Sequence, residues 1–148
     1  MAWLAIRVRG TIHAHRDVLA TFRELRLNRP NHATVLPEED SYRGMLTTVQ
    51  GYITWGPVSE ETVELLLKGR GKLHDGNPVD GKQSKEFAGK MMKSGMREVK
   101  DDIRPLFRLK APTGGWRSTK KTFTMGGALG YRKKGAKDDM DALARRML

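Results

Sequence analysis

LNRPNHATVLPEEDSYRGM, residues Leu27–Met45, is the stretch of sequence that decides the fold. Asn28 to Asn31 predict a turn, because proline fixes φ at about −65° and asparagine tolerates the dihedral angles that turns require. His32 to Leu36 predict a short strand, since threonine and valine suit a pleated sheet and Pro37 ends it. An acidic turn follows, and Ser41 is expected to cap a helix. The stretch therefore places polar side chains where a turn, a strand and a helix meet.

Two further strands and two helices are predicted around this stretch. Trp3 to Arg9 and Tyr52 to Trp55 are rich in apolar and aromatic residues, and a glycine follows each, so both predict strands. Apolar residues recur at helical spacing from Asp17 to Leu27, and a second helix is expected from Ser41 to Val49. The order strand, helix, strand, helix, strand can form a small sheet with both helices on one face, which leaves the other face free.

The remaining residues predict extensions of this core. A helix capped by Ser59 runs into a basic glycine turn, Gly69 to Lys72, and another helix is expected from Ser84 to Met96. Leu106 to Lys110 predict an edge strand, and Asp138 to Leu148 a helical tail. The chain is expected to form one compact α+β domain in three parts: residues 1–57 as the β-α-β-α-β core, 58–104 as a helical extension, and 105–148 as an extra strand, a basic arm and a C-terminal helix.

The charge balance indicates the class of partner. Lys and Arg total 28 against 17 Asp and Glu, which gives a net charge of +11 and a pI near 10.2. Such an excess favours nucleic acid, with an anionic membrane surface as the next alternative. No apolar run reaches the roughly 18 residues needed to cross a bilayer, and Arg7 and Arg9 interrupt the N-terminal apolar segment that a signal peptide would need.

Signatures of metal binding and catalysis are missing. The absence of cysteine excludes disulfides and thiolate zinc ligands and is typical of an intracellular protein. The four histidines have no carboxylate at a recognisable ligand spacing, so neither a metal site nor a cofactor is expected. Gly69 to Lys72 resemble only a fragment of a phosphate loop, and the contiguous carboxylates of Glu38 to Asp40 do not oppose one another across a substrate. We therefore expect neither an enzyme nor a small-molecule substrate.

The segment from Pro105 to Lys137 has the most uneven charge in the chain. It contains no acidic residue, and its glycines make regular packing costly, so we expect an extended arm. Cationic groups neutralise phosphates, and Trp116, Phe123 and Tyr131 offer rings on which bases stack. The alternative is a disordered tail that is basic only for solubility, but solubility requires neither aromatic residues nor the absence of carboxylates. The candidate RNA-binding residues of the arm are Arg117, Lys120, Lys121, Arg132, Lys133 and Lys134.

Two smaller groups of polar residues are also candidates for RNA contact. Arg29, Asn31, His32 and Arg43 lie where predicted elements meet, although a turn is often simply polar. Lys68, Arg70 and Lys72 follow a helix end, where cations also stabilise the helix dipole, so both explanations stay open for them.

Six short motifs resemble one known family. They are Arg-Val-Arg-Gly from Arg7, Leu-Asn-Arg-Pro-Asn-His from Leu27, Tyr-Arg-Gly-Met-Leu from Tyr42, Tyr-Ile-Thr-Trp-Gly from Tyr52, Leu-Leu-Lys-Gly-Arg-Gly-Lys from Leu66, and Arg-Arg-Met from Arg145. In this order they resemble the L-thirty family of large-subunit ribosomal proteins in its archaeal form, which is similar to the eukaryotic L-seven protein.

The resemblance implies a fold, a partner and a role. It implies a small antiparallel sheet, ferredoxin-like in outline, with helices on one side. The implied partners are large-subunit ribosomal RNA near the 5S RNA and neighbouring ribosomal proteins, and the implied role is structural. Matching positions imply RNA contact by Arg29, Asn31, His32, Arg43 and Gly44, and by Arg117, Lys120 and Lys121.

We therefore expect a structural constituent of the large ribosomal subunit, located in the cytoplasm, that binds ribosomal RNA without catalysis. The alternatives are an RNA-binding or RNA-processing factor outside the ribosome, a small RNA-modifying enzyme, and a protein of the membrane surface.

Overall fold

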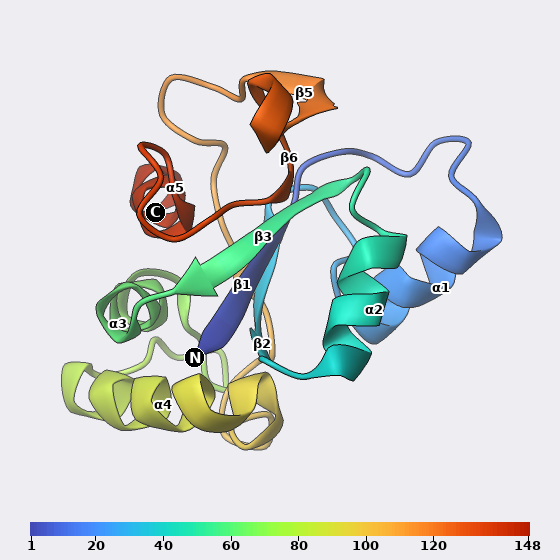
Figure 1. Cartoon of the computed structure of the whole chain (residues 1–148). Coiled ribbons are helices and arrows are strands. Elements are labelled where there is room, and N and C mark those ends of the chain that lie inside the picture. The colour runs from blue at the N-terminus through green and yellow to red at the C-terminus, as the bar shows by residue number, and fades with distance from the viewer.

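The strand and helix signals of the first 58 residues produce the predicted order of elements. The computed structural model describes residues 1–148 and contains one six-stranded sheet with five α-helices (Figure 1). The strands are β1 (Ala2–Arg7), β2 (His32–Pro37), β3 (Ile53–Val58), β4 (Phe107–Arg108), β5 (Ser118–Thr122) and β6 (Gly127–Tyr131). The helices are α1 (Arg16–Glu24), α2 (Asp40–Thr48), α3 (Glu60–Arg70), α4 (Gly81–Ser94) and α5 (Met140–Met147), with short 3-10 turns η1 (Gly95–Arg97) and η2 (Phe123–Met125).

Strand β1 is the centre of the fold. It pairs antiparallel with β2 on one side and β3 on the other, so that Leu4 lies opposite both Val35 and Gly56. Every residue of β1 is buried, because its apolar residues occupy both faces of the strand. A strand of this composition requires cover on both faces of the sheet.

The sheet is covered by helices on both faces, which corrects the prediction that one face stays free. Helices α1 and α2 pack on the face that carries Trp3 and Ala5, as predicted. Helices α3, α4 and α5 pack on the opposite face, around Leu4 and Ile6 (Figure 1). The physical reason is the unbroken apolar run of β1, which an uncovered face would leave in water.

The sheet is mixed, which corrects the expectation of a purely antiparallel one. Its strand order is β4-β2-β1-β3-β6-β5, and β6 pairs parallel with both β3 and β5. The predicted extended arm is also wrong over Gly127–Tyr131, where four of the five residues of β6 are buried. A Cβ at Gly127 would collide with the carbonyl oxygen of Lys121, so the missing side chain allows β5 and β6 to approach closely.

Several boundaries differ from the prediction by a few residues. The N-cap of α2 is Glu39, not Ser41, and β3 continues beyond Trp55 to Val58. The Ser59 cap of α3 is confirmed, since its side chain accepts a hydrogen bond from the backbone N–H of Thr62. The edge strand β4 and the tail helix α5 are confirmed as well. None of the helices has the length and apolar content needed to cross a lipid bilayer.

Gly56 and Gly44 provide a matched pair of glycine substitutions. A Cβ at Gly56 would collide with the carbonyl oxygen of Arg132 and lie 3.0 Å from Cγ of Met140, whereas a Cβ at Gly44 meets no atom within 4 Å. We expect Gly56→Ala to lower the free energy of unfolding by about 1–3 kcal/mol through overpacking. Gly44→Ala, inside α2, should raise it by about 0.5–1 kcal/mol because alanine favours helix. Urea unfolding of the two variants measures both changes, and equal stability of the two would contradict the packing between β3 and the residues after β6.

Candidate nucleic-acid interface

Strand β5 presents cations at one edge of the sheet. It is the last strand in the order and pairs only with β6, so its other edge is open. Lys120 and Lys121 on β5 and Arg117 just before it are exposed, and none of the three has an acidic partner within ion-pair distance. We call these three residues the edge-strand cations. They are free to bind the phosphates of a nucleic acid.

A hollow beside β5 brings in an arginine that the sequence did not single out for RNA contact. The hollow has a volume of about 430 Å³ and is lined by Val8, Arg9, Gly10, Ile12, Thr119 and Lys120. Arg9 is steadied there, since it donates a hydrogen bond to the carbonyl of Gly51 and lies 5.5 Å from the ring centroid of Tyr52. The basic surface at the open edge of β5 therefore includes Arg9 in addition to the edge-strand cations.

Lys133 and Lys134 lie in the loop between β6 and α5. Both side chains are exposed and lack acidic partners. The preceding residue, Arg132, lies 4.8 Å from the ring centroid of Phe123 in η2, so this loop packs against the turn that follows β5. The two lysines therefore extend from a loop that the packing of Arg132 against Phe123 holds in place.

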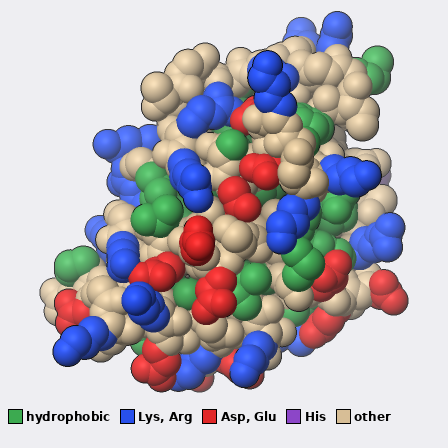
Figure 2. Space-filling view, turned by 60° about the vertical axis from the view of Figure 1, so that its left-hand side comes forward, with side chains coloured by type: hydrophobic (Ala, Val, Ile, Leu, Met, Phe, Trp, Pro, Cys, Tyr) green, Lys and Arg blue, Asp and Glu red, His purple; other side chains and the backbone are tan.

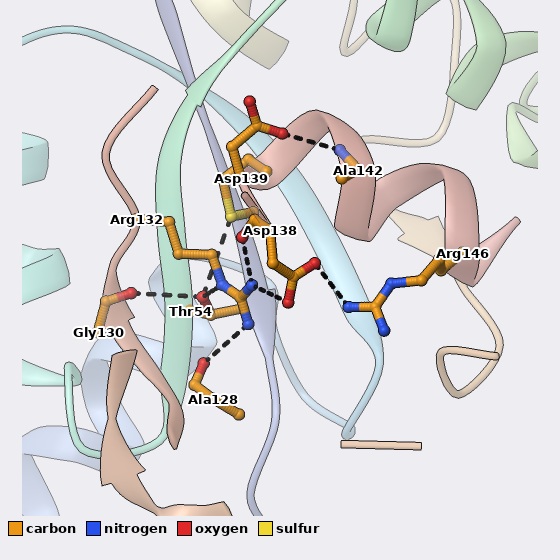
Figure 3. Close-up of polar contacts among 9 residues, drawn as sticks. Thr54, Ala128, Gly130, Arg132, Asp138, Asp139, Ala142 and Arg146 are labelled. Atoms are coloured by element: carbon orange, nitrogen blue, oxygen red, sulfur yellow. Dashed lines mark hydrogen bonds and ion pairs between the residues drawn. The ribbon is translucent and has the colours of Figure 1, made fainter. Parts of the chain in front are cut away.

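Arg132 is buried, unlike the residues around it in sequence. Its side chain is 2% exposed and forms an ion pair with Asp138, with Nη1 3.0 Å from Oδ2 (Figure 3). Nε donates to Oγ1 of Thr54 at 2.8 Å, and Nη2 donates to the carbonyl of Ala128 at 3.4 Å. Burial lowers the pKa of Arg132, and the hydrogen bond and charge of Asp138 oppose that shift. The predicted RNA contact by Arg132 is therefore corrected: no phosphate can reach this guanidinium group, which joins β3, β6 and the segment before α5.

The aromatic residues predicted to stack on bases have different surroundings. Phe123 packs against Arg132, and Trp116 packs on the small apolar cluster of Val8, Ala128 and Leu129. Tyr131 remains 47% exposed and lies edge-on to Trp55, with ring centroids 4.8 Å apart. Of the three aromatic rings, Tyr131 is the exposed one, and Phe123 and Trp116 are half-buried.

Arg43 and Gly44 lie on the exposed side of α2. Arg43 lines a shallow hollow of about 350 Å³ together with Trp3, Glu38, Thr47, Trp55 and Tyr131. It has no acidic partner at ion-pair distance, and no atom lies near the position of a Cβ on Gly44. The helix therefore places Arg43 beside Tyr131, and RNA contact by Arg43 and Gly44 stays a prediction.

The turn before β2 is held tightly by the strands on either side. Asn31 adopts a φ of +66°, its N–H donates to the carbonyl of Arg7 at 2.7 Å, and its carbonyl accepts from Leu109 N–H at 3.1 Å. Asn31 and His32 are half-buried, and Asn31 Oδ1 and His32 Nδ1 have no hydrogen-bond partner within the chain. Arg29 is exposed, so of this group it is the residue best placed to meet a phosphate.

His32 lies in a positively charged environment that disfavours its protonation. Burial lowers its pKa, and the positive charges of Arg108, Arg29 and Arg7 lower it further. As pH falls through the ordinary histidine pKa of about 6.5, the unfolded chain therefore binds a proton that the folded chain resists. The stability associated with an uncharged His32 is therefore fully present above that pH and is lost as pH falls below it.

We expect this histidine to contribute to acid sensitivity. Between about pH 7.5 and pH 5.5, wild type should lose more thermal stability than His32→Gln, which cannot titrate at this position. Melting temperatures across this range measure the difference, and the exposed His13 and His15 are common to both proteins. Identical pH profiles would show that His32 titrates normally in the folded state.

The predicted residues Lys68, Arg70 and Lys72 line a cleft near β4, at the edge of the sheet opposite to β5. We call it the basic cleft; its volume is about 400 Å³, and its ten lining residues are Lys68, Gly69, Arg70, Gly71, Lys72, Gly76, Pro78, Arg104, Leu106 and Arg108. Arg104 and Arg108 were missed because no local pattern links them to residues 68–72. Only the pairing of β4 with β2, and of Leu73 with Ile103, brings these segments together.

Arg108 connects the basic cleft with the turn before β2. It lies opposite His32 in the β2–β4 pairing, and it also lines the cleft. Since β4 and β5 are the two outermost strands, most of the candidate residues fall into two basic surfaces at opposite edges of the sheet, whereas Arg43 and Gly44 lie on α2 and Arg132 is buried. The face covered by α3, α4 and α5 instead mixes acidic with basic side chains (Figure 2).

Comparison with known proteins identifies the family of this chain. The model of the family described as "Ribosomal protein L30p/L7e" matches residues 4–53. The chain is 40% identical to the large ribosomal subunit protein uL30 of Methanosphaera stadtmanae, over 87% of this chain and 91% of that protein. It is 36% identical to the uL30 protein of Methanobrevibacter smithii, over 99% of both chains, and 37% identical to that of Methanopyrus kandleri, over 92% of this chain and 99% of that protein. The resemblance carried by the six motifs is confirmed, and the chain belongs to the uL30 family of large ribosomal subunit proteins, in its archaeal form.

Proposed function

We propose that this chain is a structural constituent of the large ribosomal subunit and binds ribosomal RNA, without catalysis, through basic surfaces at both edges of its sheet. Membership of the uL30 family supports the structural role. The observation that carries RNA binding is the lack of acidic partners: among the candidate cations, only Lys68 and Arg132 form ion pairs, with Glu64 and Asp138. The remaining candidate cations require counterions from outside the chain.

Phosphate binding follows from this excess of cations over acidic partners. A cation that replaces a counterion on RNA releases the counterion into solution, which favours association at low salt. Basic groups at two opposite edges can neutralise two separate RNA segments, and this arrangement fits a protein that stabilises a folded RNA. We include in the proposal a position near the 5S RNA and contacts with neighbouring ribosomal proteins, as the family resemblance implies.

Sedimentation of a cell extract tests the proposal. The chain, detected by an antibody or a tag, should co-migrate with the large ribosomal subunit in a sucrose gradient and remain there at high salt, because a ribosomal protein is an integral part of the particle. Migration in light fractions, or complete release by salt, would instead indicate an RNA-binding factor outside the ribosome.

A further inference from the structure

The basic cleft has a composition that points to one class of ligand. Five of its ten lining residues are cations, and none is acidic. The cations are Lys68, Arg70, Lys72, Arg104 and Arg108. We infer that the basic cleft binds the phosphodiester backbone of an unpaired RNA segment, one or two nucleotides long. This inference rests on the proposed function and specifies the kind of RNA that one of its two surfaces takes.

The charges in the cleft are mostly without internal partners. Lys68 is paired with Glu64, and Nη2 of Arg70 donates to the main-chain oxygen of Leu148 at 2.9 Å. Lys72, Arg104 and Arg108 have neither an ion pair nor a side-chain hydrogen bond within the chain. Like charges held around one concavity repel each other, and an anion placed between them removes that cost. The cleft therefore favours a polyanion over any neutral ligand.

The cleft is built in advance of binding. The N–H of Arg104 donates to the carbonyl of Lys72 at 2.8 Å, and the N–H of Leu73 donates to that of Asn77 at 2.9 Å. A Cβ on Gly71 would collide with the carbonyl oxygen of Leu67, so the chain turns closely against the end of α3. Because backbone hydrogen bonds fix these segments before binding, the cleft loses little conformational entropy when the ligand binds.

The size and shape of the cleft select an unpaired strand. A volume of about 400 Å³ lies within the range of sites that enclose a small ligand, and Leu106 is its one hydrophobic lining residue. A regular RNA duplex presents its phosphates on a rigid convex surface and can meet only the rim. An unpaired strand bends into the concavity, and on leaving past Arg108 it meets Arg29 and His32 at the neighbouring turn.

Oligonucleotide binding to the whole chain tests this inference. The probes are a fluorescent oligouridylate and an RNA duplex of the same length. The cleft variant is Lys72→Ala/Arg104→Ala/Arg108→Ala, and the matched control is Lys82→Ala/Lys85→Ala/Lys93→Ala, which removes equal charge from exposed positions on α4. All three substituted residues of the cleft variant are exposed, so thermal unfolding should stay close to that of wild type.

The cleft variant should bind the oligouridylate about tenfold or more weakly, and the slope of log K against log salt should fall by about 0.7–1.4, at ~0.7 for each of the one or two single-strand phosphates that are no longer neutralised. Its affinity for the duplex should fall no further than that of the control. Equal reductions in affinity for both variants, or equal reductions in affinity for both probes, would overturn the inference about the cleft but leave the proposed function standing. If wild type binds neither probe, the inference about the cleft is overturned as well, and co-migration with the large subunit decides the proposed function. Should the triple variant unfold, Lys72→Gln/Arg104→Gln gives the same comparison at two positions.

Discussion

Replacing Arg132 with methionine is expected to lower the free energy of unfolding by about 3–5 kcal/mol, because it breaks a buried ion pair from one side. Asp138 is 13% exposed and would lose its bond to Arg132. Thr54 would also lose a hydrogen bond across 78 positions of sequence, and the carbonyl of Ala128 would lose its side-chain donor. The substitution therefore acts at the junction of β3, β6 and α5 at once.

Chemical denaturation with a matched control measures this effect. Arg146 also binds Asp138, at 2.8 Å, but is 39% exposed, so Arg146→Met should cost less than about 1 kcal/mol. Adding Asp138→Asn to Arg132→Met should cost much less than the sum of the two single changes, because the charge left behind is removed. A small effect of Arg132→Met alone would show that the guanidinium group is solvated and would return Arg132 to the candidate RNA contacts.

Removing four exposed lysines should produce the second large effect. We expect Lys120→Ala/Lys121→Ala/Lys133→Ala/Lys134→Ala to weaken association with ribosomal RNA and to flatten its salt dependence. Each phosphate that is no longer neutralised lowers the slope of log K against log salt by about 0.7–0.9, so four such phosphates lower it by about 3. Stability should change little, since all four side chains are exposed.

The matched control removes four lysines from the opposite face. Lys82, Lys85, Lys93 and Lys100 are exposed and lie in or near α4, in a part of the sequence that also contains Glu86, Glu98, Asp101 and Asp102. Filter binding over a series of salt concentrations gives both slopes. A slope that is unchanged in the first variant would mean that these lysines do not neutralise phosphates. A slope that is reduced equally in the control would mean that net charge rather than the basic surface near β5 determines binding.

Local signals predicted much of the fold. The Ser59 cap and the acidic first turn of α3 are contained in a few consecutive residues, and the structure confirms both. The order of the first five elements followed in the same way from apolar spacing and glycines. The covered second face could also have been inferred, because β1 is apolar at positions that face both ways.

Long-range pairing determined what the sequence did not predict. Gly127 and Gly130 suggested a loose arm, yet they belong to a buried strand with β3 and β5 on either side, and the missing side chain of Gly127 permits the close approach of β5. Arg132 belongs to a run of basic residues, but its partner Thr54 is far away in sequence, so its burial had no local sign. Only part of the basic cleft could be predicted from the sequence for the same reason, since Arg104 and Arg108 join it through the pairing of distant strands.

A structure of the large ribosomal subunit that contains this chain is the most direct test of the account. Lys120 and Lys121 at one edge of the sheet, and Lys72 and Arg104 at the other, are predicted to have nitrogen atoms about 2.7–2.9 Å from phosphate oxygens of ribosomal RNA. If these side chains face solvent or protein at both edges, the claim that unpaired cations bind ribosomal RNA is contradicted.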